Sequence, residues 1–537
     1  MGKVCRYCGL DNDDTATTCR SCGTVLPPPA WSQVVPPPVP PPPPAPPPAA
    51  VEWRPPPPPP YTDLVPRKRR SKWIAPVAVL ALVGAGAGVW ALTQRGDDGP
   101  SFPAQWDPRV ADLVDFVEDE RGLDFKHPVE VEFLTDAAFR ERVQSADQEL
   151  TAEEREEIDH AGEFFRSLGL AEGELDLLEL FNQLSGETIL AFYDLEEQRI
   201  IVRGTTLDVD RKVTLVHEMT HALQDQHFDL SEVRAAGDEY SSSAPDALIE
   251  GDAKEVERAY VEELSSADRR EHETAQDDFR DDLEVDEVPL VMQISQSAPY
   301  DFGPVLVQLL KAEGGTDRLD AAFRDPPDAE EYFVDGVAYL EEDARADVAV
   351  PDIPDGATVL LDGGEFGVLG WYLMLSERID PHDALHAIDG WDGDNYVAYR
   401  DNDRTCTRVT FEAESGTAGD LMRDAVETWI GEFGAADPRI FDATSTGFTL
   451  ETCDPGPESE HVTDRIEETY VLPIARAQFV AALVDASGAG LDPSNARCVA
   501  RSIIDDVTFT ELTDPEGAYF QTDEYQRKLL SFLRDCT

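Results

Sequence analysis

The sequence predicts an α+β protein that is mainly helical with a small sheet, preceded by a cysteine-rich head and one transmembrane helix. Three observations lead to this prediction. From Val110 onward, apolar residues recur at helical spacing, interrupted by a few short runs that alternate as strands do. Four cysteines lie near the N-terminus, far from the other four. An uncharged run extends from Trp73 to Leu92, directly after a basic cluster.

The chain is strongly acidic: its 537 residues include 109 Asp and Glu against 44 Lys and Arg, a formal net charge of −65. The N-terminal part up to Arg95 is slightly basic, so the excess of negative charge lies in the remainder. Such a field repels nucleic acid and excludes DNA or RNA as a partner of this part. Regular apolar periodicity indicates a folded domain with a densely carboxylated surface rather than disorder.

The head, residues 1–26, carries the pattern Cys5-x2-Cys8-x10-Cys19-x2-Cys22. A glycine follows the second cysteine of each pair and permits the tight turn that presents two thiolates to one metal ion. This spacing predicts a structural zinc ion, and the segment resembles the short zinc-ribbon heads of membrane proteins. Two disulfides are the alternative, which requires an oxidising compartment.

Residues 27–72 form a proline-rich linker with a basic end, predicted as a stiff polyproline II spacer or a ligand for proline-binding modules. Residues 73–93 are predicted as a transmembrane helix, because about 20 residues span the hydrocarbon core. The long preceding segment argues against a cleaved signal peptide. With one predicted span, the chain would be a single-pass cell membrane protein. The basic residues 67–72 lie before the span, so the positive-inside rule predicts that its N-terminus is cytoplasmic. Its zinc ribbon would contact a cytoplasmic protein partner, and its C-terminal domain would be extracellular.

We expect a mainly helical domain over residues 101–395 and a disulfide-braced region over 396–537. The charged residues 265–287 are expected as a mobile helix or loop. Helices are expected at Arg109–Glu120, in the charged stretch to Leu184, around His217, and at Ala247–Leu264, Pro299–Ala312, Gly367–Arg378, Gly419–Ile430, Ile474–Asp485 and Tyr525–Arg534. Strands are expected at Val129–Phe133, Thr188–Tyr193, Arg199–Arg203, Tyr396–Tyr399, Arg408–Phe411 and Phe448–Thr452.

The chemistry is expected in the segment His217-Glu218-Met219-Thr220-His221. On a helix, positions i and i+4 share one face, so both histidines can reach one metal ion while Glu218 approaches a water on it. The apolar residues around the segment indicate a buried helix, where histidines without a partner would be costly. A core helix with incidental histidines is the alternative.

A catalytic zinc ion needs a third protein ligand and an open position for water. His227 lies at the spacing at which the metzincin pattern places its third histidine, but Gln224 occupies the position of that pattern's helix-breaking glycine. On a continuous helix, His227 would point away from the metal. Glu250, on the next helix among apolar residues, is the favoured third ligand, and Gly251 permits close approach of the helices.

These residues resemble the gluzincin (peptidase MA-like) metallopeptidases. The similarity extends from about Trp106 to Tyr399 and rests on His217–Asp229, Glu250-Gly251-Asp252-Ala253, Phe192-Tyr193-Asp194, Ala298–Gly303 and Gly390–Tyr396. It implies a mainly helical gluzincin-like domain whose zinc ion is bound by His217, His221 and Glu250, with Glu218 as general base. Thermolysin-like members have an aspartate where this chain has Lys254. A supporting carboxylate must therefore come from elsewhere, with Asp225, Asp246 and Asp252 as candidates.

The predicted function is that of a zinc metalloendopeptidase acting on a peptide or protein substrate outside the membrane. Zinc lowers the pKa of its bound water towards ~7, and Glu218 takes the proton and passes it to the leaving amine. Tyr300 is the candidate donor to the oxyanion, with a core tyrosine as the alternative. A non-catalytic scaffold or sensor that binds protein partners is the alternative function, against which the intact Glu218 argues.

His382 and His386 are spaced four apart, which suggests a second metal site. Because Pro381 opens this short segment, two surface histidines at a helix start are the favoured interpretation.

The four C-terminal cysteines are expected to form two disulfides. Chain proximity favours Cys406–Cys453 and Cys498–Cys536 among the three possible pairings. Such bridges would stabilise the C-terminal region.

Overall fold

A computed structural model describes two compact units of the chain. The first comprises Met1–Pro55 with Leu264–Glu271, and the second Pro56–Glu263 with His272–Thr537. The described residues are 3–4, 11–12, 20, 102–148, 152–177, 180, 189–235, 243–282, 288–341, 345–361, 363–433, 438–457, 465–485, 490–514 and 517–537. The predicted ribbon ligands Cys5, Cys8, Cys19 and Cys22, the linker 27–72 and the predicted span 73–93 lie outside these residues. In the first unit, β1 (Lys3–Val4) pairs antiparallel with β2 (Asp11–Asn12).

The membrane prediction requires correction. Among the described helices, none is long and apolar enough to cross a membrane. Even the 35-residue α10 (Leu290–Arg324) breaks at Gly314 and Gly315, and its second half is rich in charged residues. We therefore correct the predictions of one transmembrane helix and of a single-pass cell membrane protein with a cytoplasmic N-terminus and an extracellular C-terminal domain. They rested on the hydropathy of residues 73–93 and on the basic residues 67–72 that precede them.

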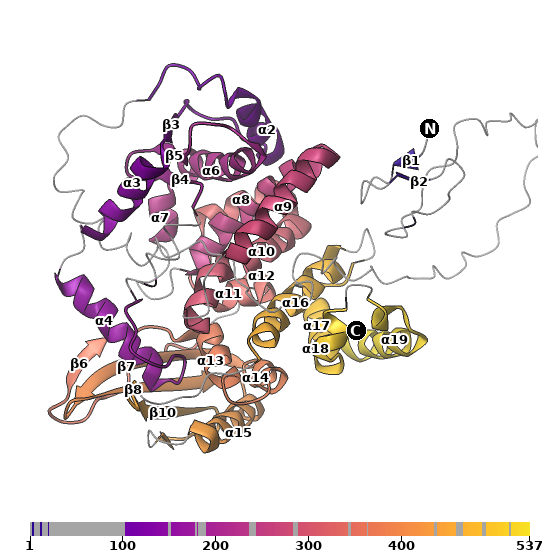
Figure 1. Cartoon of the computed structure of the whole chain (residues 1–537). Helices are drawn as coiled ribbons and strands as arrows, with labels where there is room; N and C mark the ends of the chain where they lie inside the picture. Colours follow the sequence, from indigo (N-terminus) through magenta and orange to yellow (C-terminus); the bar gives the residue numbers. More distant parts are fainter. Residues whose placement is uncertain are drawn as a thin grey trace, which may run out of the picture. The chain divides into compact units, whose positions relative to one another are not determined.

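The second unit is mainly helical with small sheets (Figure 1). Its first sheet has three strands, in which β5 (Arg199–Arg203) lies between its parallel neighbour β3 (Glu130–Leu134) and its antiparallel neighbour β4 (Ala191–Asp194). Residues Val114, Val131, Ile200, Leu215 and Met219 belong to one buried core that joins this sheet to α2 (Ala111–Arg121) and α6 (Val209–Phe228). This core fixes α6, which carries both histidines of the motif, against the sheet.

Helix α6 is continuous from Val209 to Phe228, as the absence of a glycine at position 224 predicts. The Asp208 carboxylate accepts the backbone N–H of Arg211 and caps its start. The next helices along the chain are α7 (Leu230–Arg234) and α8 (Ser243–Glu263), and α8 packs against both α6 and α10.

Helices α8 and α10 cross with their backbones in contact, at a pair of glycines. A Cβ atom at Gly303 would collide with the carbonyl oxygen of Ala247 and lie 2.9 Å from the Cα of Gly251. The predicted helix Pro299–Ala312 is the middle of α10, which begins nine residues earlier and continues through Pro299 and Pro304. The crossing fixes the part of α8 that carries Glu250.

The second sheet is antiparallel, with strand order β6 (Thr358–Leu361), β7 (Trp391–Asp401), β8 (Arg404–Ala413), β10 (Gly447–Cys453) and β9 (Arg439–Phe441). Helices α13 (Gly367–Ser376) and α15 (Gly416–Phe433) pack on it (Figure 1). The Asp394 carboxylate accepts hydrogen bonds from the indole N–H groups of Trp371 and Trp391, which connects α13 to β7. Strand β7 continues through the boundary that we placed between residues 395 and 396.

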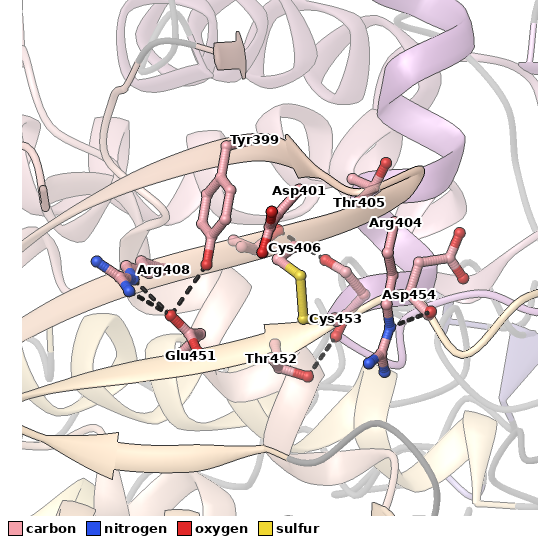
Figure 2. Close-up of a disulfide and its surroundings, with 12 residues drawn as sticks. Tyr399, Asp401, Arg404, Thr405, Cys406, Arg408, Glu451, Thr452, Cys453 and Asp454 are labelled. Atoms are coloured by element: carbon pink, nitrogen blue, oxygen red, sulfur yellow. Dashed lines mark hydrogen bonds and ion pairs between the residues drawn. A yellow bond between two sulfur atoms is a disulfide. The ribbon is translucent and has the colours of Figure 1, made fainter. Parts of the chain in front are cut away.

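Both expected disulfides are present. Cys406–Cys453 joins directly paired residues of β8 and β10, beside a Glu451 carboxylate that accepts from Tyr399 and Arg408 (Figure 2). Cys498–Cys536 joins α17 (Pro493–Asp506) to α19 (Asp523–Cys536). The remaining helices are α3 (Asp136–Gln148), α4 (Ala152–Ser167), α9 (Ser266–Asp282), α11 (Glu331–Val334), α12 (Gly336–Glu341), α14 (Pro381–Ala387), α16 (Ile466–Asp485), α18 (Phe509–Leu512) and η2 (Tyr519–Gln521).

We expect Gly303→Ala to destabilise the protein by roughly 1–3 kcal/mol, because an added methyl group has no room between α8 and α10. Urea denaturation of the variant and the wild type measures the difference. The control is Gly431→Ala on α15, where a Cβ meets no atom within 4 Å and the helix propensity of alanine should leave stability unchanged or slightly higher. Equal stabilities of the two variants would contradict the close crossing.

Candidate metal centre

His217, His221 and Glu250 converge on one position. The two histidines lie one turn apart on α6, and Glu250 reaches them from α8. Nε2 of His217 lies 3.0 Å from both Nε2 of His221 and Oε2 of Glu250, and Nε2 of His221 lies 3.2 Å from the same carboxylate oxygen. All three side chains are buried, so bulk water does not separate them.

The outer nitrogen of His221 defines its tautomer. Its Nδ1 lies 3.0 Å from Oε1 of Gln224. The amide nitrogen of Gln224 already donates to the carbonyl of Ile249 and to the carboxylate of Asp252, so the amide oxygen is the atom that faces His221. Nδ1 of His221 therefore carries the proton, and Nε2 of the neutral ring presents a lone pair.

The outer nitrogen of His217 also faces a polar group. Its Nδ1 lies 3.0 Å from Oε2 of Glu257, an ion-pair distance without the geometry of a hydrogen bond. Its Nε2 faces Nε2 of His221 and Oε2 of Glu250. Three potential ligand atoms thus face one another, and a positive charge among them, a proton or a metal ion, would offset their repulsion.

The three donors fit a divalent metal ion. Two imidazoles and one carboxylate form a donor set of catalytic zinc sites, with bonds of ~2.0–2.2 Å that leave tetrahedral ligand atoms roughly 3.3 Å apart. The observed separations of 3.0 to 3.2 Å are close to this value. Burial lowers the pKa of His217, but Glu250 and Glu257 outweigh it and raise that pKa to about 10, so that without a metal ion a proton on this ring supplies the positive charge that the position favours.

Glu218 lies beside this position without being one of the three donors. Its Oε2 accepts the backbone N–H of Tyr193 on β4 at 2.8 Å, which orients the carboxylate. Burial raises the pKa of Glu218, although His217 and His221 oppose the shift. A buried, oriented carboxylate next to a metal position is suited to accept a proton from bound water.

Tyr300 also belongs to the site. Its ring stacks along that of His217, with centroids 6.1 Å apart and planes inclined by 23°, and its hydroxyl is close enough to Glu250 for that carboxylate to raise its pKa. The residue is half-buried, so it is not sealed in the core. Burial, and then the charge of Glu250, holds the pKa of Tyr300 well above its usual value, which keeps the hydroxyl protonated as a donor.

The structure places His227 away from the three donors. It is half-buried near the end of α6, and its Nε2 lies 2.8 Å from the carbonyl oxygen of Asp124. His382 and His386 do not share a metal position either. His382 lies 3.5 Å from both Asp380 and Glu468, a cluster in which Arg465 already pairs with Asp380 at 3.0 Å. His386 turns to Asp389.

The carboxylate that supports His217 was missed in the sequence. Of the three candidates, Asp225 accepts from Tyr193, Asp246 pairs with Arg234, and only Asp252 reaches a ligand, through Gln224. The direct partner of His217 is Glu257, seven residues after Glu250 on the same face of α8. This i+7 spacing was the available signal. Lys254, one turn after Glu250, pairs with Glu257 at 2.6 Å and orients it.

No protein-family model, curated protein or solved structure shows significant similarity to this chain. The functional interpretation therefore rests on the residues and their geometry.

We expect Glu257→Gln to weaken metal binding roughly 10- to 100-fold, because the carboxylate beside Nδ1 of His217 loses its charge. Competition with a chromogenic zinc chelator measures the affinity in a Cys5→Ser/Cys8→Ser background, which removes the predicted ribbon site. Glu255→Gln is the matched control, because Glu255 lies on another face of α8 and binds Arg258 and Gln308. A Glu257 variant that retains wild-type affinity would show that His217 needs no such partner.

Proposed function

We propose that the protein is a zinc-dependent peptidase with a gluzincin-type site, in which Glu218 is the general base. The observation that carries the proposal is the convergence of two imidazole nitrogens and the Glu250 carboxylate on one buried position. Glu218 and Tyr300 add the two groups that hydrolysis requires beyond a metal, a proton acceptor and a hydrogen-bond donor.

The chain's own residues divide the work of hydrolysis. When bound, the zinc ion supplies an activated water and polarises the peptide carbonyl. The Glu218 carboxylate accepts the proton of the attacking water and delivers it to the nitrogen of the leaving amine. Tyr300 donates its hydroxyl hydrogen to the oxygen that gains negative charge. The backbone N–H of Tyr193 holds Glu218 in place during both proton transfers.

Metal analysis of the full-length chain, together with peptide cleavage, tests the proposal. We expect two zinc ions per chain, one lost in Cys5→Ser/Cys8→Ser and the other in His217→Ala/His221→Ala. Glu218→Gln should retain both ions and lose roughly 10²- to 10⁴-fold in kcat on a casein-derived fluorogenic peptide library. A chain without zinc at the histidine pair, or cleavage that persists in Glu218→Gln, would exclude this function. Zinc binding without any cleavage would favour a non-catalytic scaffold or sensor.

Tyr300→Phe should lower kcat by roughly 10²- to 10³-fold with zinc content unchanged, because only the hydroxyl donor is removed. Steady-state kinetics and metal analysis measure the two effects separately. Tyr339→Phe is the control, because the Tyr339 hydroxyl donates to the carbonyl of Asp325 on the surface. If Tyr300→Phe keeps full kcat, the tyrosine is a packing residue.

A further inference from the structure

Along α8, Glu250 lies between the residues of two ion pairs. Asp246, Glu250, Lys254 and Glu257 follow one another at intervals of four, four and three residues and share one face of the helix. Towards the C-terminus, Lys254 pairs with Glu257 at 2.6 Å. Towards the N-terminus, Asp246 pairs with Arg234 of α7, whose Nε lies 2.8 Å from Oδ1.

The cations of these two pairs, Lys254 and Arg234, differ in whether they have N–H donors without a partner. Lys254 Nζ supports Glu257, which in turn faces His217. Arg234 uses Nε for Asp246, and among the described residues its two terminal nitrogens have no hydrogen bond or ion pair. The Arg234 side chain is 40% exposed, whereas that of Asp246 is only 11% exposed. A buried carboxylate therefore holds a guanidinium whose outer edge is open.

The charge of Arg234 interacts with charges of the metal centre. After Asp246, the charged group that stabilises its positive charge is Glu250, a predicted ligand. The pKa of Tyr300 responds to Asp246 in turn. The Arg234–Asp246 pair thus lies in the field of the reacting groups.

The charges around the site make this open edge selective. Glu218, Glu250 and Glu257 would repel an anionic substrate group. Among the described residues, Arg234 is a cation near these carboxylates whose terminal N–H groups have no partner. Two parallel N–H groups of a guanidinium match a carboxylate in bidentate geometry, and fixing Nε pre-orients that fork.

We propose that Arg234 binds a carboxylate of the peptide substrate next to the scissile bond, so that the preferred substrates are peptides with an anionic group there. The proposal rests on the peptidase function. The carboxylate is either the C-terminus of a short peptide or the side chain of an Asp or Glu residue. Both present the same chemistry to Arg234, and matched peptides distinguish them.

Four fluorogenic peptides of otherwise identical sequence distinguish a C-terminal carboxylate from a side-chain carboxylate. Two end in a free acid and two in an amide, and within each pair one peptide has Glu and the other Gln two residues after the scissile bond. With the full-length zinc-loaded protein, we expect kcat/KM to be roughly 10- to 100-fold higher when the recognised carboxylate is present, mainly through KM. A preference for the free acid identifies the C-terminus, and a preference for Glu identifies a side chain. Equal kcat/KM for all four peptides would overturn the proposal.

Substitution of Arg234 tests the assignment to this residue. Arg234→Gln should reduce the preference to less than about threefold, and Arg234→Lys should restore part of it. Arg465→Gln is the matched control, because Arg465 has similar exposure and pairs with Asp380 at 3.0 Å away from the metal centre. A purely structural arginine would alter kcat and stability with the preference between peptides unchanged, and that result would overturn the proposal.

A binding measurement separates this inference from the peptidase function. Two dipeptide hydroxamates, identical except for a terminal carboxylate or carboxamide, are titrated calorimetrically into the zinc-loaded protein. Tighter binding of the carboxylate, lost in Arg234→Gln, supports the role of Arg234 even if no peptide is cleaved, whereas equal binding overturns it. Absence of cleavage by the wild type counts against the peptidase function and leaves the binding result to decide the role of Arg234.

Discussion

The architecture of the site depends on one electrostatic constraint, the mutual repulsion of three electron-rich atoms. The Nε2 atoms of His217 and His221 and a carboxylate oxygen of Glu250 lie 3.0 to 3.2 Å apart in a buried position. Without a cation, α6 and α8 would be driven apart there, so the fold must hold them together independently. It does so from both sides. The sheet core fixes α6, and the contact of Gly251 with Gly303 fixes α8 against α10.

A buried ion network adds to this restraint. Arg121 of α2 pairs with Asp252 of α8 and Asp320 of α10, and Asp252 also accepts from the Gln224 amide that orients His221. Arg121 is 2% exposed and Asp252 fully buried, so removing these charges from water is costly, and such pairs are weak evidence for stability. What these pairs determine is the position of a predicted ligand. Through Arg121 and Gln224, the Asp252 carboxylate links α2, α8 and α10 to the side chain that orients His221. An apolar replacement of equal volume would lose that link.

The sequence predicted the local parts of this arrangement and missed the parts that depend on long-range packing. Helical spacing joined His217 to His221, and Gln224 excluded His227, because both arguments need only helix geometry. Glu257 was missed because, in a chain with 109 acidic residues, its i+7 spacing from Glu250 is too common a pattern to distinguish it from a solvated glutamate. The order of the five-stranded sheet also depends on distant pairings. The membrane prediction rested on residues 67–93, which lie outside the described residues, and none of the described helices is long and apolar enough to cross a membrane.

The positive charge of Lys254 has an electrostatic consequence in so acidic a chain. A carboxylate in its place, one turn after Glu250, would add another negative charge to a position already surrounded by Glu218, Glu250 and Glu257. The Lys254–Glu257 pair places a carboxylate beside His217 without adding net charge. The Arg234–Asp246 pair is also neutral as a unit, so the predicted ligand Glu250 lies between two balanced pairs. The negative charge that attracts a metal ion is thereby concentrated on the residues that face it.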